Sequence, residues 1–190
     1  MEKLTVATRE HDGTWFGVLI GDESRLLASA FSMSKKTLER HLRADAPRTP
    51  IHQLTNDSNI ALNGMIDIYE GRKATNKVRL DWDSVSGFQK NVCQRMNEIP
   101  MGRVTSYGLI AKRISSGPRA VGTVVARNPW PLFIPCHRVV PASLDIGNYS
   151  IGGTLSEHGC EVKRDLLERE GVPIQGDRIS SMALWIPAGA

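Results

Sequence analysis

Residues 133–140 read Phe-Ile-Pro-Cys-His-Arg-Val-Val, and the apolar residues on both sides predict a buried segment around a Pro-Cys-His-Arg tetrad. Burying His137 and Arg138 beside a thiol is costly unless these groups are paired. A neighbouring base or cation is also what turns a cysteine into a nucleophile. A single buried cysteine is more often just a small apolar residue, but this setting predicts that Cys136 is reactive.

The other two cysteines lack such neighbours. Cys93 lies on the apolar face of a predicted helix, and Cys160 is expected in a polar loop. Three cysteines without a CxxC pair make a poor disulfide framework and a poor metal site, so we expect free thiols in a reducing compartment.

Targeting and membrane signals are not evident in the sequence. No apolar run approaches the roughly 18 residues of a membrane span, and the first residues do not read as a signal peptide. We expect a cytoplasmic protein (nucleoid-associated if prokaryotic) that has no membrane partner.

The region before the tetrad is uniformly basic. The chain has a net charge of +4 and a pI of about 9.1, but residues 99–144 contain no acidic residue at all. Such a segment suits a partner lined with phosphates, and a solvated basic face is the alternative.

Two short helices are predicted inside this basic region, over Tyr107–Ile114 and Arg119–Ala126. Thr105 or Ser106 can cap the first helix, and Pro118 suits the first position of the second. A three-residue turn that contains Gly117 joins them, which is the outline of a helix-turn-helix.

The second of these helices is unusually slim. Its small residues suit a close approach to a DNA backbone or minor groove rather than a major-groove reading of base edges. Arg119 is its one long side chain near the start and could insert toward the base stack. The alternative is a small helix packed against the protein's own core. The small residues are Ala120, Gly122, Thr123 and Ala126.

The first third of the chain predicts an α/β domain. Leu4–Thr8, Trp15–Ile20 and Leu26–Phe31 are rich in strand formers and are separated by turn residues, which predicts an antiparallel meander. Ser34 would cap a helix over Lys35–Arg43, and Asp57 or Ser58 would cap one that runs through Tyr69.

Three segments are expected along the chain. Residues 1–80 would form the α/β domain and residues 81–172 a mainly helical second domain with the helix-turn-helix. Residues 173–190 would form a C-terminal tail.

The motifs together resemble the O6-alkylguanine-DNA alkyltransferase (methylated-DNA–protein-cysteine methyltransferase) family. The similarity runs in order over roughly residues 88–172, whereas the first third matches only in its expected layout. The segments that carry it are Ile99–Tyr107, Arg119–Gly122, Asn128-Pro129, Ile134–Val139, Gly147–Ser150 with Gly152-Gly153, and Lys163, Leu166-Leu167 and Glu170-Gly171.

The resemblance implies a one-shot repair reaction. The target nucleotide is flipped out of the duplex, and Cys136 takes the alkyl group from O6 of guanine as a stable thioether. His137, working through a water, would be the base and Glu170 would orient it. Tyr107 would assist the leaving guanine, although a core tyrosine is its plain alternative.

The remaining implied roles concern binding. The backbone of Cys136 and Val139, with Tyr149 and Ser150, would line the base pocket, and Arg119 would fill the gap in the stack. Asn128 would tie the recognition helix to the cysteine segment, with a simple turn role as alternative. Contacts to double-stranded DNA, approached from the minor groove, would come from Tyr107, Arg119, Ala120, Gly122, Thr123 and Arg127.

The resemblance also implies a ribonuclease-H-like layout for the first domain and a monomer. Nothing in the sequence suggests a cofactor, and a zinc site like that of some relatives is not expected, because the first 80 residues contain His11, His41 and His52 but no cysteine. The chain departs from the family at Ile151, which would make the pocket wall bulkier, and at Thr154–Glu161, which would add residues before the last helix. The Ser115–Gly117 turn is short for the family.

Three other readings remain open on the residues alone. A lesion-binding protein of the same fold would lack the chemistry, but those proteins lack the cysteine. A helix-turn-helix regulator could use Cys136 as a sensor. A cysteine hydrolase would need an oxyanion hole and would turn over.

Overall fold

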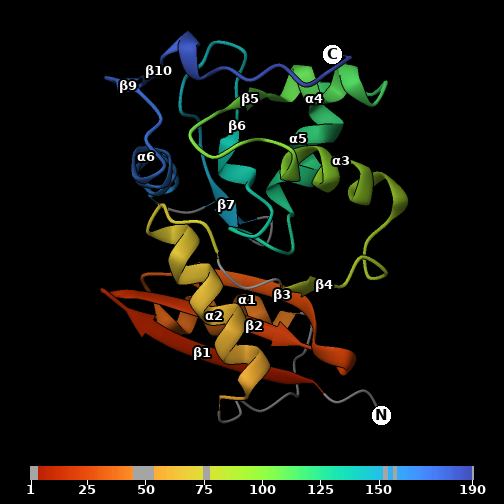
Figure 1. Cartoon of the computed structure of the whole chain (residues 1–190), viewed down its shortest axis with the longest axis vertical. Helices are drawn as coiled ribbons and strands as arrows, with labels where there is room; N and C mark the ends of the chain where they lie inside the picture. Colours follow the sequence, from red (N-terminus) through yellow and green to blue (C-terminus); the bar gives the residue numbers. More distant parts are fainter. Residues whose placement is uncertain (1–3, 45–53, 75–77, 152–153, 156–157, 190) are drawn as a thin grey trace. The chain divides into compact units, whose positions relative to one another are not determined.

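The structure, a computed structural model, describes residues 4–44, 54–74, 78–151, 154–155 and 158–189, with the backbone alone at 43, 44, 151, 154 and 155. The chain divides into two compact units. The N-terminal unit comprises Met1–Ser84 together with Pro129–Phe133, and the C-terminal unit comprises Val85–Asn128 and Ile134–Ala190. Figure 1 shows the elements of both units.

The N-terminal unit is built on the predicted antiparallel meander. Strands β1 (Thr5–His11) and β2 (Thr14–Ile20) form a hairpin, and β3 (Arg25–Ser32) pairs with β2. Asp12 and Gly13 at the hairpin turn both have positive φ, as a type I′ turn requires.

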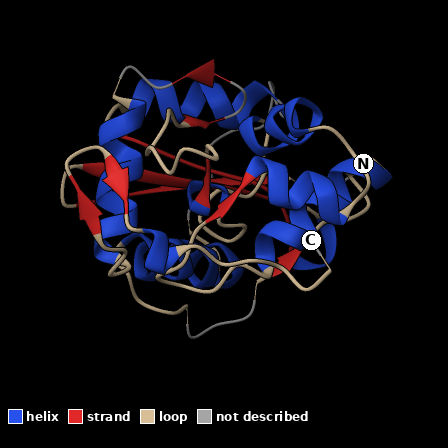
Figure 2. Ribbon diagram, turned by 90° about the horizontal axis from the view of Figure 1, so that it is seen from above, coloured by secondary structure: helices blue, strands red, loops and turns tan. Residues whose placement is uncertain are grey.

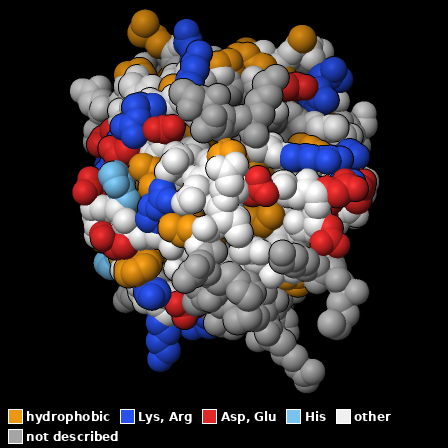
Figure 3. Space-filling view, turned by 60° about the horizontal axis from the view of Figure 1, so that its bottom comes forward, with side chains coloured by type: hydrophobic (Ala, Val, Ile, Leu, Met, Phe, Trp, Pro, Cys, Tyr) orange, Lys and Arg blue, Asp and Glu red, His pale blue; other side chains and the backbone are white. Residues whose placement is uncertain are grey.

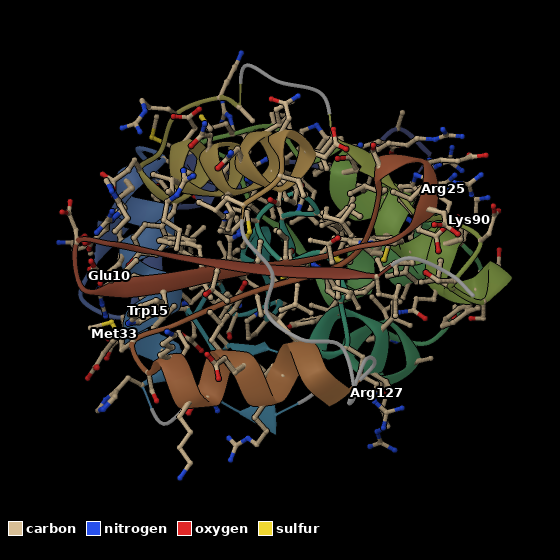
Figure 4. All side chains as sticks on the ribbon, turned by 90° about the horizontal axis from the view of Figure 1, so that it is seen from below. Glu10, Trp15, Arg25, Met33, Lys90 and Arg127 are labelled. Carbon is tan, nitrogen blue, oxygen red and sulfur yellow. The ribbon has the colours of Figure 1, made fainter. Side chains whose placement is uncertain are left out.

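Helices cover both faces of this sheet, α1 (Lys35–Ala44) on one and α2 (Asn56–Tyr69) on the other (Figures 1 and 4). Neighbouring residues of β2 point to opposite faces. A side chain at Gly17 would collide with Leu42 of α1, whereas the Phe16 ring packs edge-on against Tyr69 of α2 at 5.1 Å. Burial on both faces explains why β2 carries no polar side chain after Thr14.

The start of α2 differs from the prediction. Neither Asp57 nor Ser58 is the cap, because Thr55 holds that position and its hydroxyl accepts a hydrogen bond from the Ser58 N–H. The Ser58 hydroxyl in turn accepts from the Thr55 N–H, which forms a capping box. The predicted Ser34 cap of α1 is present, with its hydroxyl 3.3 Å from the Thr37 nitrogen.

Two features of the N-terminal unit were not predicted. A two-residue strand, β4 (Arg79–Leu80), pairs in parallel with β3. Residues 129–133 also belong to this unit, where the buried Trp130 donates its indole N–H to the Leu26 carbonyl at 2.8 Å. The Trp130 ring packs against Trp82 at 4.9 Å.

Acidic and basic side chains are interspersed on the face shown in Figure 3. At one end of the sheet, Glu10, Trp15 and Met33 lie near one another (Figure 4), and the Lys35 ammonium lies 4.7 Å above the Trp15 ring.

The C-terminal unit begins with three helices in the predicted places. They are α3 (Gly87–Asn97), α4 (Tyr107–Arg113) and α5 (Pro118–Ala126). Ser106 is the cap of α4, since its hydroxyl accepts from the Leu109 N–H at 3.1 Å. Pro118 occupies the first position of α5, where its missing N–H costs nothing.

Short strands lie among these helices (Figure 2). The parallel pair β5 (Thr105–Ser106) and β6 (Val139–Val140) joins the start of α4 to the segment after the cysteine. The remaining pairs are the antiparallel β7 (Ser150–Ile151) with β8 (Thr154–Leu155) and β9 (Ile174–Gln175) with β10 (Arg178–Ile179).

The last helix, α6 (Gly159–Arg169), corrects one expectation about the segment before it. Part of Thr154–Glu161 is helical, so Cys160 lies in the first turn of α6 and not in a loop. Position 159, the first residue of this helix, requires glycine, because a Cβ there would lie 2.5 Å from the Tyr149 backbone oxygen.

Residues after α6 pack into the same unit. The Val104 N–H donates to the Ala183 carbonyl, and the Trp185 N–H donates to the Val104 carbonyl. Ile179 and Ala183 join the buried cluster that includes Leu167. The short 3-10 helices of the chain are η1 (Asp22–Ser24), η2 (Cys136–Arg138) and η3 (Ser181–Ala183).

Among the helices that the structure describes, none has the length and the apolar character of a membrane span.

Candidate active site

Cys136 opens the short 3-10 helix η2, directly after Pro135. The residue is only 3% exposed, and its backbone N–H donates to the Ile134 carbonyl at 2.8 Å. The thiol is within hydrogen-bond distance of the Tyr149 hydroxyl, at 3.4 Å. The predicted reactive cysteine is therefore held in a fixed, nearly dry position.

A buried network of charges lies beside it. The Nε2 atom of His137 is 2.8 Å from a carboxylate oxygen of Glu170, and both side chains are 1% exposed. Arg138 donates two hydrogen bonds to the same carboxylate, at 2.8 and 2.7 Å, and a third to the Ile99 carbonyl. The pairing satisfies the condition for burying such groups.

Arg138 was predicted to be buried beside the thiol and to need a partner, but no role in the site was assigned to it. Its guanidinium is almost buried and donates hydrogen bonds to Glu170 and to the Ile99 carbonyl. It does not belong to a basic surface.

Burial and pairing set the protonation states in this network. Burial opposes the ionisation of Glu170, but hydrogen bonds from His137 and Arg138 outweigh it and lower the pKa of Glu170 to about 2. Burial lowers the pKa of His137, so its imidazole is neutral at neutral pH. The Nδ1 atom of His137 is buried and makes no hydrogen bond to the described protein groups.

The thiol itself is protonated at rest. Burial raises the pKa of Cys136, against the opposing effects of Tyr149, Asn128 and Lys163. A nucleophilic step at Cys136 therefore needs a base to take the thiol proton.

Asn128 follows the end of α5 and reaches the cysteine segment. Its side-chain amide donates to the Ile134 carbonyl at 2.8 Å, and the residue is 4% exposed. This contact links α5 to the backbone two residues before Cys136, in the way expected from the sequence.

The thiol faces a small cavity of about 40 Å³. This volume is far below the roughly 300 Å³ of ordinary ligand pockets, so a base-sized ligand requires the mouth to widen. Its lining includes five predicted residues and four others: Tyr107, Gly122, Cys136, Tyr149 and Ser150, with Val125, Ala126, Asn148 and Lys163.

Val139, also predicted for the pocket, is fully buried behind it, and its carbonyl accepts a hydrogen bond from Lys163. The side chain of Ile151, expected to thicken the pocket wall, lies outside the described residues. Lys163 was not predicted as a site residue. A signal for it was present in the sequence, because Lys163 lies four residues before Leu167, at a helix position where an apolar residue is expected.

Most of the predicted DNA-contacting residues lie on one exposed face of α5 or directly after its end, whereas Tyr107 is the first residue of α4. Arg119, Ala120, Thr123 and Arg127 are exposed, whereas Val121, Val124 and Val125 are buried on the opposite face. Gly122 lies at the edge of this face, where a Cβ would be 3.9 Å from the Tyr107 ring. The Arg127 side chain points away from the protein (Figure 4).

A possible metal-ligating group lies in the N-terminal unit. His11 Nε2 is 3.6 Å from an oxygen of Asp12 and 3.8 Å from one of Glu70, and Asp12 is well exposed. A surface ion pair accounts for these contacts, and His52 lies outside the described residues.

Comparison with protein families finds a match over residues 87–172 to the family described as 6-O-methylguanine DNA methyltransferase, DNA binding domain. Over 165 residues the chain is 32% identical to a methylated-DNA–protein-cysteine methyltransferase of Thermococcus gammatolerans, covering 83% of this chain and 89% of that protein. With the protein of the same name from Methanocaldococcus vulcanius, identity is 44% over 89 residues, which span 47% of this chain and half (50%) of that protein.

Solved structures resemble the whole fold. The crystal structure of O6-methylguanine-DNA methyltransferase from Pyrococcus kodakaraensis strain KOD1 matches with a TM-score of 0.67 at 30% identity, covering 90% of this chain and 100% of that one. Mycobacterium tuberculosis OGT in complex with DNA matches with a TM-score of 0.66 at 27% identity, covering 87% and 92% of the two chains.

Proposed function

The chain belongs to the methylated-DNA–protein-cysteine methyltransferase family, and we propose that it repairs DNA by direct reversal, moving an alkyl group from O6 of guanine to Cys136. The observation that carries the proposal is the position of the Cys136 thiol in a cavity, with the His137–Glu170 pair buried beside it. The catalytic assignment follows from that arrangement.

His137 acts as the base in this proposal. The resting thiol is protonated and the imidazole is neutral, so a proton must pass from Cys136 to His137 as the sulfur attacks. Nε2 already faces Glu170, which leaves Nδ1 to accept the proton through a water. Glu170 stabilises the imidazolium that results.

The bond changes balance without a cofactor. A bond forms between the Cys136 sulfur and the alkyl carbon as the bond from that carbon to O6 breaks. The leaving guanine gains negative charge, which the Tyr107 hydroxyl at the cavity stabilises by donating a hydrogen bond. Burial raises the pKa of Tyr107, so the phenol is protonated and able to donate.

DNA reaches the site through α4 and α5, which form a helix-turn-helix in this proposal. The exposed face of α5 is small and basic, and suits a minor-groove approach to double-stranded DNA that contains O6-alkylguanine. The guanine must leave the stack to reach a buried thiol. The N-terminal unit takes a ribonuclease-H-like layout, and the protein acts as a cytoplasmic monomer.

The product is a thioether, which no group in the cavity can cleave, so each molecule repairs one lesion. When a fixed amount of protein is mixed with increasing amounts of duplex containing O6-methylguanine, the repaired base is expected to reach a plateau at one equivalent. Continued repair beyond one equivalent would contradict the proposal and favour a turnover enzyme of the cysteine hydrolase kind.

Replacing Arg119 with Ala is expected to slow transfer from duplex DNA about tenfold or more, while transfer from free O6-methylguanine base is unchanged. A guanidinium that fills the gap in the stack offsets part of the cost of flipping, and about 1.4 kcal/mol equals a tenfold rate. Single-turnover rates on the two substrates measure the difference.

Arg113→Ala is the matched control, since Arg113 is an exposed arginine in the last turn of α4. An equal loss on duplex and free base in Arg119→Ala would remove the flipping role.

A further inference from the structure

Lys163 occupies a place where lysine is rarely found. The residue is 1% exposed and lies on the buried face of α6 with Leu166 and Leu167. A buried ammonium is costly without a compensating partner. A methionine or leucine would satisfy the packing of this helix face, so the charge needs its own explanation.

The partners of Lys163 do not include an anion in the resting protein. Its Nζ donates to the Val139 carbonyl at 2.7 Å, and no ion pair joins it to a carboxylate of the described residues. Arg138 offers the contrast, because that buried cation is held by the Glu170 carboxylate. The two buried cations beside the reactive segment are therefore compensated differently.

The titratable groups around Lys163 come from every element that packs there. From α6 itself comes Cys160, which is partly exposed. Cys136 and His137 face it from η2, and Tyr107 and Tyr149 line the same cavity. Burial raises the pKa of both tyrosines, and burial keeps His137 neutral. Cys136 is the one member of this set that the proposed reaction turns into an anion.

We propose that Lys163 is a positioning residue that serves as the counter-ion of the Cys136 thiolate while it forms, and that alkylation leaves its ammonium buried without an anion. This inference rests on the proposed function only for the step in which the alkyl group arrives. Its electrostatic part concerns the thiol in the unreacted protein.

The placement makes Lys163 responsive to the state of Cys136. Burial lowers the pKa of Lys163 to about 8, with the thiolate of Cys136 acting in the opposite direction. The ammonium is thus mostly charged at neutral pH while remaining sensitive to loss of its anion. A thioether carries no charge, so alkylation removes the attraction and retains the cost of burial.

The first test needs no DNA. Wild type and Lys163→Met are treated with iodoacetamide from pH 6 to pH 10, and modification is followed on the tryptic peptide 128–138, which contains Cys136 and no other cysteine. At each pH below the midpoint of the profile, the rate is expected to be about tenfold lower in Lys163→Met, which corresponds to a midpoint about one pH unit higher. Lys112→Met, which removes an exposed lysine of α4, should keep the wild-type profile.

A purely structural lysine would leave this pH profile in place, so an unchanged midpoint in folded Lys163→Met overturns the proposal. Protein that fails to transfer from O6-methylguanine, yet shows the shifted profile, would contradict the proposed function and leave the role of Lys163 standing.

A second measurement uses wild type alone, so it tests the role of Lys163 even if Lys163→Met does not fold. The Lys163 ammonium is titrated by NMR before and after carboxamidomethylation of Cys136. Its midpoint is expected to fall by about one pH unit or more, because the modified sulfur can no longer form the anion that keeps the proton on Lys163 as the pH rises. An unchanged midpoint would show that the two groups are not coupled, and would overturn the inference.

Discussion

Glu170→Gln is expected to lower the free energy of unfolding by about 3–5 kcal/mol, because it strips a buried guanidinium of its anion. Arg138 makes two hydrogen bonds to the Glu170 carboxylate, whose side chain is 1% exposed, so water cannot replace the lost charge. Denaturant unfolding of wild type and variant measures the difference. Glu168→Gln is the matched control, since Glu168 lies in α6 with its side chain about half exposed.

The Glu170–Arg138 pair also makes the free energy of unfolding depend on pH in the acid range. The pKa of Glu170 is about 2 in the folded protein against an ordinary 4.5, so its stabilising effect is complete above pH 4.5 and is lost as the pH falls toward 2. The shift corresponds to about 3 kcal/mol. Wild type should lose this component on acidification, whereas Glu170→Gln should lack it. Equal acid sensitivity of the two proteins would contradict the assignment.

His137→Gln is expected to reduce the rate of alkyl transfer from duplex DNA by about 10² to 10⁴, with little effect on DNA affinity. Glutamine can still donate a hydrogen bond to Glu170 but cannot accept the thiol proton. Because the Cys136 pKa is raised by burial, the loss should become smaller as the pH rises and the thiolate forms without a base.

Single-turnover rates at several pH values measure this effect, with His158→Gln as control because its side chain is exposed at the start of α6. A His137→Gln variant that transfers at the wild-type rate at neutral pH would rule out the base role.

The local elements were predictable because their signals are local. Ser106 and Pro118 mark the starts of α4 and α5, and the meander follows from short runs of strand formers separated by turn residues. The neighbours of Cys136 in the sequence also indicated a buried reactive centre. In each case the residues that determine the feature lie within a few positions of one another.

The features that escaped prediction depend on contacts between distant residues. The sequence indicated that a buried Arg138 needs a partner, but that partner, Glu170, lies 32 positions away. Strand β4 is two residues long and exists through its pairing with β3. Trp130 joins the N-terminal unit through a hydrogen bond to Leu26, which no pattern near Trp130 could indicate.

Prediction of the residues around the cavity was limited in the same way. Tyr107, Tyr149 and Ser150 were assigned by resemblance, and the structure gathers them around Cys136. Lys163 joins them from α6 because Gly159 lets the start of that helix approach the Tyr149 backbone. The role of a buried lysine is defined by what surrounds it, and the sequence alone does not give those surroundings.

Transfer of an alkyl group to Cys136 can be followed by mass spectrometry after the protein is mixed with an excess of duplex containing O6-methylguanine. We expect each molecule to gain one methylene mass, located in the tryptic peptide 128–138 and absent in Cys136→Ala. Intact protein without that gain, while still binding the lesion duplex, would contradict the account and favour a lesion-binding or sensor protein.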